Sequence, residues 1–366
     1  MQTHCSNCLK VCWANIPCDY CTYAMYCSEE CKALEWKKFH DVECAVFPAL
    51  LKMDFSKLDL FSLRLAIQAV RESSSIQELR ELLEEVDNCT DPRTKGFCNG
   101  VFESNHYRSI LSLVTNVEKR SFQDLFRRSM DSCFILYYLA TCTNMFGSML
   151  KQNLPDLINN SDVIFVGGLI MRHQQIIPCN FHSFSEVCKV DLVECGIAAF
   201  PFFSLINHSC SPNMVRSRRH NLEIAYVMYP IKKGEQILDN YGQFHAITPK
   251  HARQKELLKQ YHFKCNCVPC QEDWPLYMQL KSFKDLVKKK EDQNKVSKAL
   301  RKSDAYMYIA AKGNVSNVPN MVNDLLKVIE VILQIVPMPC LEMCHVVETL
   351  KFVYDLGGNR FDVPEL

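Results

Sequence analysis

The sequence predicts an α+β protein in which helical segments surround a β-rich core. Apolar residues recur every three or four positions from Leu50 to Val86, which is the spacing of amphipathic helices. Runs such as Leu222–Val227 alternate in β-favouring residues between turn signals and predict short strands. Eleven of the 21 cysteines fall into two tight clusters, which indicates metal-binding segments in a chain of this size.

The composition sets the number of domains and excludes several classes of protein. A chain of 366 residues with 48% hydrophobic residues is long enough for two or three domains. The formal charge of +1 creates no global field, so we expect no nucleic-acid partner. The first residues lack the features of a signal peptide, and no apolar run approaches the roughly 20 residues that a membrane helix needs. We therefore expect no membrane contact and a location in the cytoplasm and nucleus.

The first cysteine cluster, residues 5–44, has the spacing of a zinc-binding module. Its ligands come in four pairs: Cys5 and Cys8, Cys18 and Cys21, Cys27 and Cys31, and His40 and Cys44. Two intervening residues let both thiolates of a pair reach one metal, and three put both ligands on one side of a helical turn. Eight ligands fill two tetrahedral sites with no position open to water, so we predict two structural zinc ions. The segment is too poor in apolar residues to fold without them.

The middle of the chain is predicted to change from helix to strand. Residues 45–173 form a helical insert, with one long helix expected from about Phe122 to Leu150. From about Gln174 the apolar period shortens, and the run Gln175–Ile177 favours a strand. We therefore place a compact β-rich core at residues 174–245.

Helices are expected again towards the C-terminus. Residues 246–272 carry the second cysteine cluster, and residues 273–366 form a helical region. A charged segment spans Lys281–Lys302, and an amphipathic one runs from Met321 to Val336 and stops at Pro337. The ten cysteines outside the clusters, such as Cys133, are interpreted as small core residues.

Three short strings carry the second metal site and a candidate active site. The first is Asn207-His208-Ser209-Cys210-Ser211-Pro212-Asn213, and the second is Gly234-Glu235-Gln236-Ile237-Leu238-Asp239-Asn240-Tyr241-Gly242. The third is Cys265-x-Cys267-x2-Cys270. Three clustered thiolates leave a tetrahedral zinc one ligand short, and Cys210 is the natural fourth. The sequence therefore predicts a third structural zinc.

These strings resemble known families. The segment from Ala24 to Cys31, followed by Trp36 and His40, resembles the MYND zinc finger, and the three later strings resemble the SET domain with its post-SET zinc cluster. Together they are similar to the SET and MYND domain protein lysine methyltransferases, particularly the branch with tetratricopeptide repeats. The resemblance implies a MYND finger at 5–44, a SET core at 174–245 and a post-SET zinc flap at 246–272. It also implies interleaved zinc sites, with Cys5, Cys8, Cys27 and Cys31 on one metal and Cys18, Cys21, His40 and Cys44 on the other.

The resemblance further implies a reaction, a cofactor and site residues. It implies methyl transfer from S-adenosylmethionine to a lysine of a histone or non-histone protein substrate, with proline-containing peptides as partners of the MYND finger. Asn207 and His208 are implied to hold the cofactor, and Tyr241 to stand at the methyl-transfer pore. Phe263 matches an aromatic residue that packs against the cofactor, and Asn180 matches a further cofactor contact. The substrate protein, the number of methyl groups and the oligomeric state stay open.

The chain departs from the family pattern before the MYND finger. No Gly-x-Gly stretch, which wraps the cofactor in the family, and no tetratricopeptide repeats precede Cys5. The resemblance therefore implies a truncated form with one wall of the cofactor pocket exposed. Two functions follow: a lysine methyltransferase, favoured by the intact Asn207, His208 and Tyr241, or a catalytically impaired scaffold that binds partners through the MYND surface.

Overall fold

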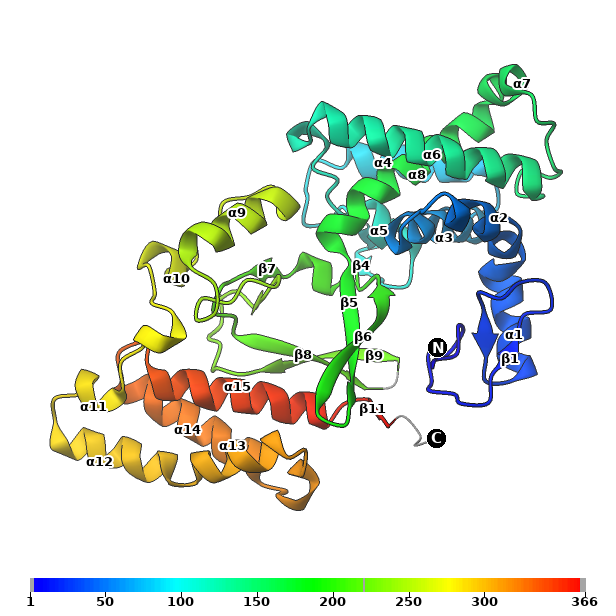
Figure 1. The fold of residues 1–366 in the computed structure, drawn as a ribbon. Coiled ribbons are helices and arrows are strands. Elements are labelled where there is room, and N and C mark those ends of the chain that lie inside the picture. The colour runs from blue at the N-terminus through cyan, green and yellow to red at the C-terminus, as the bar shows by residue number, and fades with distance from the viewer. Residues whose placement is uncertain (1–2, 220, 363–366) are drawn as a thin grey trace. The chain divides into compact units, whose positions relative to one another are not determined.

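A computed structural model describes residues 3–219 and 221–362 (Figure 1). The chain divides into two compact units, and each has a hydrophobic core of its own. Unit 1 comprises Met1–His182 and Ala198–Ser204, and unit 2 comprises Ser183–Ile197 and Leu205–Leu366. The predicted combination of helices and strands is confirmed.

Unit 1 begins with a small module that has little apolar core. Strands β1 (Ile16–Pro17) and β2 (Met25–Tyr26) form an antiparallel pair, followed by α1 (Glu29–Glu35), the π-helical turn η1 (Trp36–His40) and α2 (Asp41–Lys52). Its own hydrophobic cluster consists of cysteines with Ala24 and Tyr26, whereas Val42, Val46 and Leu50 of α2 are buried in a core shared with later helices. That a module this small folds only with metal ions stays a prediction from the sequence.

The rest of unit 1 is helical, as predicted. Its elements are α3 (Lys57–Glu72), α4 (Ile76–Asn88), the β3–β4 hairpin (Phe97–Cys98 and Val101–Phe102), α5 (Tyr107–Leu111), η2 (Val117–Lys119), α6 (Phe122–Cys142), α7 (Leu154–Asn159) and α8 (Ser161–Asn180). Helix α8 packs against both α3 and α6. The helix starts are locally encoded: Ser56 and Asp59 form a capping box at α3, and Ser121 caps α6.

The prediction of a strand at Gln175–Ile177 is wrong. These residues lie in the last turns of α8, and Ile176 and Ile177 are buried in the core of unit 1. A short run of β-branched residues fits a buried helix as well as a buried strand, and here packing against α3 and α6 decides for the helix. The first strand of the core starts at His182, so the predicted core boundary at residue 174 lies inside a helix.

The interpretation of the scattered cysteines as core residues is also wrong for several of them. Cys133 is exposed, and Cys89 and Cys195 are only half-buried, whereas Cys340 is buried. Cys133 lies on α6 beside Phe134, on a face of that helix that points to solvent. The helical period, and not the residue type, sets its exposure.

The strands of unit 2 are short. Strand β5 (His182–Cys188) lies between β6 (Asp191–Ala198) and the parallel β11 (Arg360–Phe361). The predicted strand at Leu222–Val227 is confirmed as β9, which pairs antiparallel with β8 (Met214–Arg219). A third pair joins β7 (Asn207–His208) in parallel to β10 (Leu238–Asp239), with Asn207 opposite Leu238. The 3-10 turn η3 (Phe203–Leu205) precedes β7.

The helices of unit 2 follow the strands. They are α9 (Lys250–Tyr261), α10 (Val268–Gln271), η4 (Tyr277–Gln279), α11 (Phe283–Leu286), α12 (Lys290–Ala299), η5 (Leu300–Lys302), α13 (Ser303–Ala311), η6 (Val315–Asn317), α14 (Met321–Ile335) and α15 (Leu341–Leu356). Helices α13 and α14 pack against α15, α12 packs against α14, and all four share one core (Figure 1). Tyr354 of α15 stacks on Tyr226 of β9 with ring centroids 4.1 Å apart. Within the described ranges, no helix has both the length and the apolarity that a bilayer span requires.

Candidate functional site

Two sets of four ligand atoms come together in the N-terminal module. Cys5, Cys8, Cys27 and Cys31 form one set, and Cys18, Cys21, His40 and Cys44 form the other. All ligand atoms of a set lie within 4.8 Å of one another. These are the interleaved sets that the family resemblance implies.

The distances within these sets fit zinc. Tetrahedral Zn–S bonds of about 2.3 Å place two sulfur atoms about 3.8 Å apart. The Sγ atoms of Cys8 and Cys27 are 3.6 Å apart, and those of Cys18 and Cys44 are 3.9 Å apart. Cys12 stands outside both sets, with its thiol donating to the Ala14 carbonyl. The donor chemistry and the spacing therefore suit two tetrahedral zinc sites.

A buried ion-pair network supports the histidine ligand. His40 Nε2 is 3.4 Å from Cys21 Sγ, while its Nδ1 lies 3.9 Å from the fully buried Glu43 carboxylate. The Arg64 guanidinium of α3 donates two hydrogen bonds to Glu43, at 2.6 and 2.7 Å, and pairs with Glu35 at 2.8 Å. Burial favours the neutral acid, but Arg64 outweighs it and holds the pKa of Glu43 below its usual value. A carboxylate behind a ligating imidazole orients the ring, so α3 helps to build the second site.

A third set lies in unit 2. Cys210 follows β7, and Cys265, Cys267 and Cys270 follow α9, yet their four Sγ atoms lie within 4.8 Å of one another. The Sγ atoms of Cys210 and Cys270 are 3.7 Å apart, which is again the sulfur–sulfur distance of a tetrahedral zinc site. Such a metal would tie the segment after α9 to the segment that contains Asn207 and His208.

Arg253 is part of this third site, although the sequence did not indicate it. Its side chain is fully buried in α9. The guanidinium Nε donates to Cys210 Sγ at 3.2 Å, and Nη2 donates to Cys270 Sγ at 3.6 Å. The third nitrogen, Nη1, donates to the Thr248 carbonyl at 2.6 Å. Four thiolates around Zn²⁺ leave a net charge of −2, and a buried cation that donates to the sulfurs offsets it.

We expect Arg253→Met to weaken the third metal site without unfolding the other two. Loss of an outer-shell partner costs roughly 10–100-fold in metal affinity, so this variant should lose one zinc ion per chain to a chelator that leaves the wild type loaded. Native mass spectrometry counts the ions directly. Arg128→Met is the matched control, because Arg128 is a buried arginine that bonds Asp124 and the Gln174 carbonyl. Equal zinc retention by both variants would show that Arg253 does not support the metal.

Four of the predicted cofactor residues converge near β7. The backbone N–H of Tyr241 donates to His208 Nδ1 at 3.0 Å, and the two rings lie 5.2 Å apart between centroids. The ring of Phe263 packs near both. Its centroid lies 6.2 Å from that of His208 and 6.4 Å from that of Tyr241, which it meets edge to face. Asn207 precedes His208 on β7 and donates from its amide to Gln236 at 3.2 Å. The parallel pairing of β7 with β10 therefore brings the Asn-His string to the tyrosine string.

Tyr261 joins this aromatic group, and sequence reasoning missed it. It is the last residue of α9, and its ring lies 4.7 Å from that of Tyr241. Its only signal in the sequence was its place two residues before Phe263. His262 between them adopts a left-handed backbone (φ +60°), which ends the helix.

Tyr241 and His208 are both neutral at pH 7. Burial raises the pKa of Tyr241 to about 12, and the Asp239 carboxylate adds to the effect. Burial lowers the pKa of His208 to about 4. The Tyr241 hydroxyl donates to the Ile206 carbonyl at 2.6 Å. The site therefore offers aromatic faces and a protonated hydroxyl rather than a charged acid or base, which suits a reaction that depends on positioning.

Asn180 belongs to unit 1, whereas the other four predicted residues belong to unit 2. It ends α8, and its amide donates to the carbonyls of Ile176 and Val114 at 2.7 and 2.9 Å. The hydroxyl of Ser204 donates to the Asn180 carbonyl at 2.6 Å. These bonds give Asn180 a role in the fold of unit 1, and its contact with a cofactor stays a prediction.

Comparisons with known proteins agree with this geometry. The sequence profile of the SET domain matches residues 18–242. The chain is 27% identical over 307 residues to the protein-lysine N-methyltransferase SMYD4 of Mus musculus, covering 73% of this chain and 38% of that protein. It is also 27% identical over 319 residues to SMYD4 of Homo sapiens, with 74% and 39% coverage. The histone-lysine N-methyltransferase ASHR1 of Arabidopsis thaliana is 26% identical over 270 residues, with 74% and 46% coverage. The chain thus spans less than half the length of these relatives.

Proposed function

This chain belongs to the SET domain family, and from that premise we propose that it transfers a methyl group from S-adenosylmethionine to a lysine side chain of a protein. The relatives named above are protein-lysine and histone-lysine methyltransferases. The observation that carries the proposal is the group of His208, Tyr241, Tyr261 and Phe263, assembled from segments far apart in the sequence.

The residues of this group fit the proposed cofactor. S-adenosylmethionine supplies an electrophilic methyl group on a positively charged sulfonium when it is bound. The faces of Tyr241, Tyr261 and Phe263 attract a cation through their quadrupoles. Asn207 and His208 would hold the cofactor beside them.

The roles of the side chains follow from their protonation and burial. Tyr241 keeps its proton at neutral pH and donates it to the Ile206 carbonyl, so its hydroxyl oxygen is free to accept a hydrogen bond that orients the amine. Neutral His208 fixes the backbone of Tyr241 through the bond to its Nδ1. The surrounding rings exclude water, so the lysine amine stays neutral and keeps its lone pair available. The three cysteine-rich sets would each hold a structural zinc ion, which makes three ions per chain.

A second function is supported by the surface of the N-terminal module. Tyr20 is 76% exposed, Trp36 is 37% exposed, and their rings lie 5.3 Å apart. Exposed aromatic pairs bind proline-containing segments, which enter as preformed extended helices. We propose that this surface recruits proline-containing peptides, either as substrates or, in a scaffold, as the main partners.

Isothermal titration of the zinc-loaded chain with S-adenosylmethionine separates the two functions. We expect micromolar binding, on the order of −8 kcal/mol, because the aromatic group is assembled in the described structure. His208→Ala should lose that binding while the zinc content and the circular dichroism stay unchanged. If the folded, zinc-loaded wild type released no heat on titration, the proposed methyltransferase function would be contradicted and the scaffold function would be favoured.

A further inference from the structure

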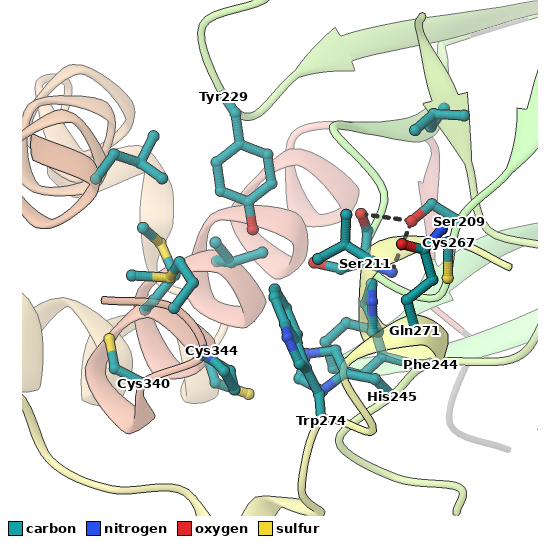
Figure 2. A pocket seen from close by; sticks show the side chains of 18 of the residues that line it. Ser209, Ser211, Tyr229, Phe244, His245, Cys267, Gln271, Trp274, Cys340 and Cys344 are labelled. Carbon is teal, nitrogen blue, oxygen red and sulfur yellow. Dashed lines mark hydrogen bonds between the residues drawn. The ribbon is translucent and has the colours of Figure 1, made fainter. Parts of the chain in front are cut away.

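Unit 2 contains a cavity of about 450 Å³ that the proposed function does not use (Figure 2). Three segments line it: residues 209–245 of the β-rich core, residues 266–274, which include Cys267 of the third metal set, and residues 333–347 around the start of α15. In Figure 2, Tyr229 and Trp274 face the same space from different segments, with Cys340 and Cys344 on the α15 side. A volume of several hundred Å³ is typical of sites for small molecules.

This cavity is separate from the proposed methyl-transfer site. Asn207, His208, Tyr241 and Phe263 are absent from its lining, whereas Ser209, which follows His208, and Cys267 of the third metal set take part in it. The cavity therefore lies behind the cofactor segment and the third metal set, and a molecule bound there would not compete with the cofactor for contacts.

Hydrogen bonds hold the walls of the cavity in place. The Tyr277 hydroxyl and His345 Nε2 are 2.5 Å apart, and Leu341 N donates to the Lys281 carbonyl at 3.0 Å. Ser282 donates from its hydroxyl to the Glu342 carboxylate at 2.6 Å. These bonds tie the segment after Trp274 to α15, so the space between them exists before any ligand arrives. Preformed sites cost less ordering entropy on binding.

The lining selects for an uncharged aromatic ligand. None of the described lining residues is Asp, Glu, Lys or Arg, so a charged molecule would lose its hydration without a partner. The rings of Trp274 and His245 meet edge to face at 5.0 Å, and Phe244 lies 4.8 Å from His245. Met343 and Val347 of α15 complete an apolar wall. Flat aromatic molecules gain most from such surroundings.

One buried polar atom in the wall has no partner. His245 is 5% exposed, and its Nδ1 makes no hydrogen bond within residues 3–219 and 221–362. Leaving a buried polar atom unsatisfied is unfavourable, and a ligand with a hydrogen-bonding group would remove that cost. The other ring nitrogen donates to the Pro275 carbonyl, which can only accept, so Nδ1 of the neutral ring is the acceptor and the ligand group is a donor.

We propose that this cavity binds a small uncharged aromatic molecule that carries one hydrogen-bond donor for His245 Nδ1. Binding at this site needs neither the cofactor nor the substrate lysine. A test of ligand binding here is therefore independent of a test of methyl transfer.

Three two-ring probes test the ligand chemistry on the full zinc-loaded chain. Indole carries a donor, isoquinoline an acceptor, and 1-methylindole neither, while their sizes are similar. Ligand-observed NMR should show binding of indole at least about ten-fold tighter than that of isoquinoline or 1-methylindole, the effect of one hydrogen bond in a buried site. Equal binding of all three would overturn the role of His245, and no binding of any probe would overturn the site.

Two variants of α15 test the location. Val347→Phe places a phenyl group in the cavity and should abolish probe binding. Glu348→Phe adds the same group at an exposed position one residue away and should bind as the wild type does. Unchanged zinc content and circular dichroism show that both variants are folded. Binding by Val347→Phe equal to that of the wild type would place the ligand elsewhere and contradict the proposal. Protection of Cys344 from alkylation by the bound probe, with the exposed Cys133 as reference, gives a second readout.

Discussion

Tyr241→Phe is expected to lower the methyl-transfer rate by about 10²–10³-fold while the fold and cofactor binding persist. The variant keeps the aromatic ring that contacts His208, Tyr261 and Phe263 and removes only the hydroxyl. The proposal assigns that hydroxyl to the amine in the transition state, so its loss should reduce kcat more than it weakens binding. Transfer of tritiated methyl groups to core histones or a lysine peptide library measures the rate, and calorimetry measures cofactor affinity.

The matched control is Tyr308→Phe, which removes a hydroxyl from a tyrosine of α13 that is 66% exposed. It should leave both rate and affinity unchanged. If Tyr241→Phe methylated as fast as the wild type, Tyr241 would have no part in the reaction. If it lost cofactor binding as well, the hydroxyl would act in holding the site together through its bond to the Ile206 carbonyl.

Removal of zinc is expected to unfold the N-terminal module. The hydrophobic cluster of the module consists chiefly of the metal ligands themselves, so little apolar burial of its own remains to hold the apo form. Structural zinc sites contribute about 10–16 kcal/mol of apparent binding free energy, which is as large as the whole stability of a typical small domain. A strong chelator should therefore make residues up to about Cys44 sensitive to proteolysis. Mass spectrometry of the fragments locates the cuts.

The same chelator loaded beforehand with zinc is the control and should leave the digestion pattern unchanged. Fragments cut within the module should appear before cuts inside α6 and α8, whose helices share an apolar core. A module that kept its protease resistance after all zinc had been removed would show that the pairing of Arg64 with Glu35 and Glu43 is enough to hold it.

The local features of this chain were predictable from the sequence because each depends on residues close together along it. The spacing of Cys5 to Cys44 indicated four ligand pairs, and the three-and-four period predicted the helices of unit 1. The strand at Leu222–Val227 was predicted from its alternation. The mutual arrangement of the cysteine pairs, and the roles of Asn207, His208 and Tyr241, came from family resemblance rather than from spacing.

Predictions from local sequence patterns were wrong where packing between distant segments outweighs the local conformational preference of the residues. The run Gln175–Ile177 carries β-branched residues, but contacts of α8 with α3 and α6 make it helical. Cys133 follows the outward face of α6, although its residue type is usually buried.

The sequence by itself thus determined the presence of the metal-binding segments, the mixed fold and the strings that contain Asn207, His208 and Tyr241. Only the tertiary structure decided that Tyr261 lies on Tyr241, that Arg253 reaches two thiolates of the third metal set, and that His245 lines a cavity. The physical reason is that these contacts join segments tens of residues apart. Their distances are set by how helices and strands pack, and no local spacing of residue types encodes them.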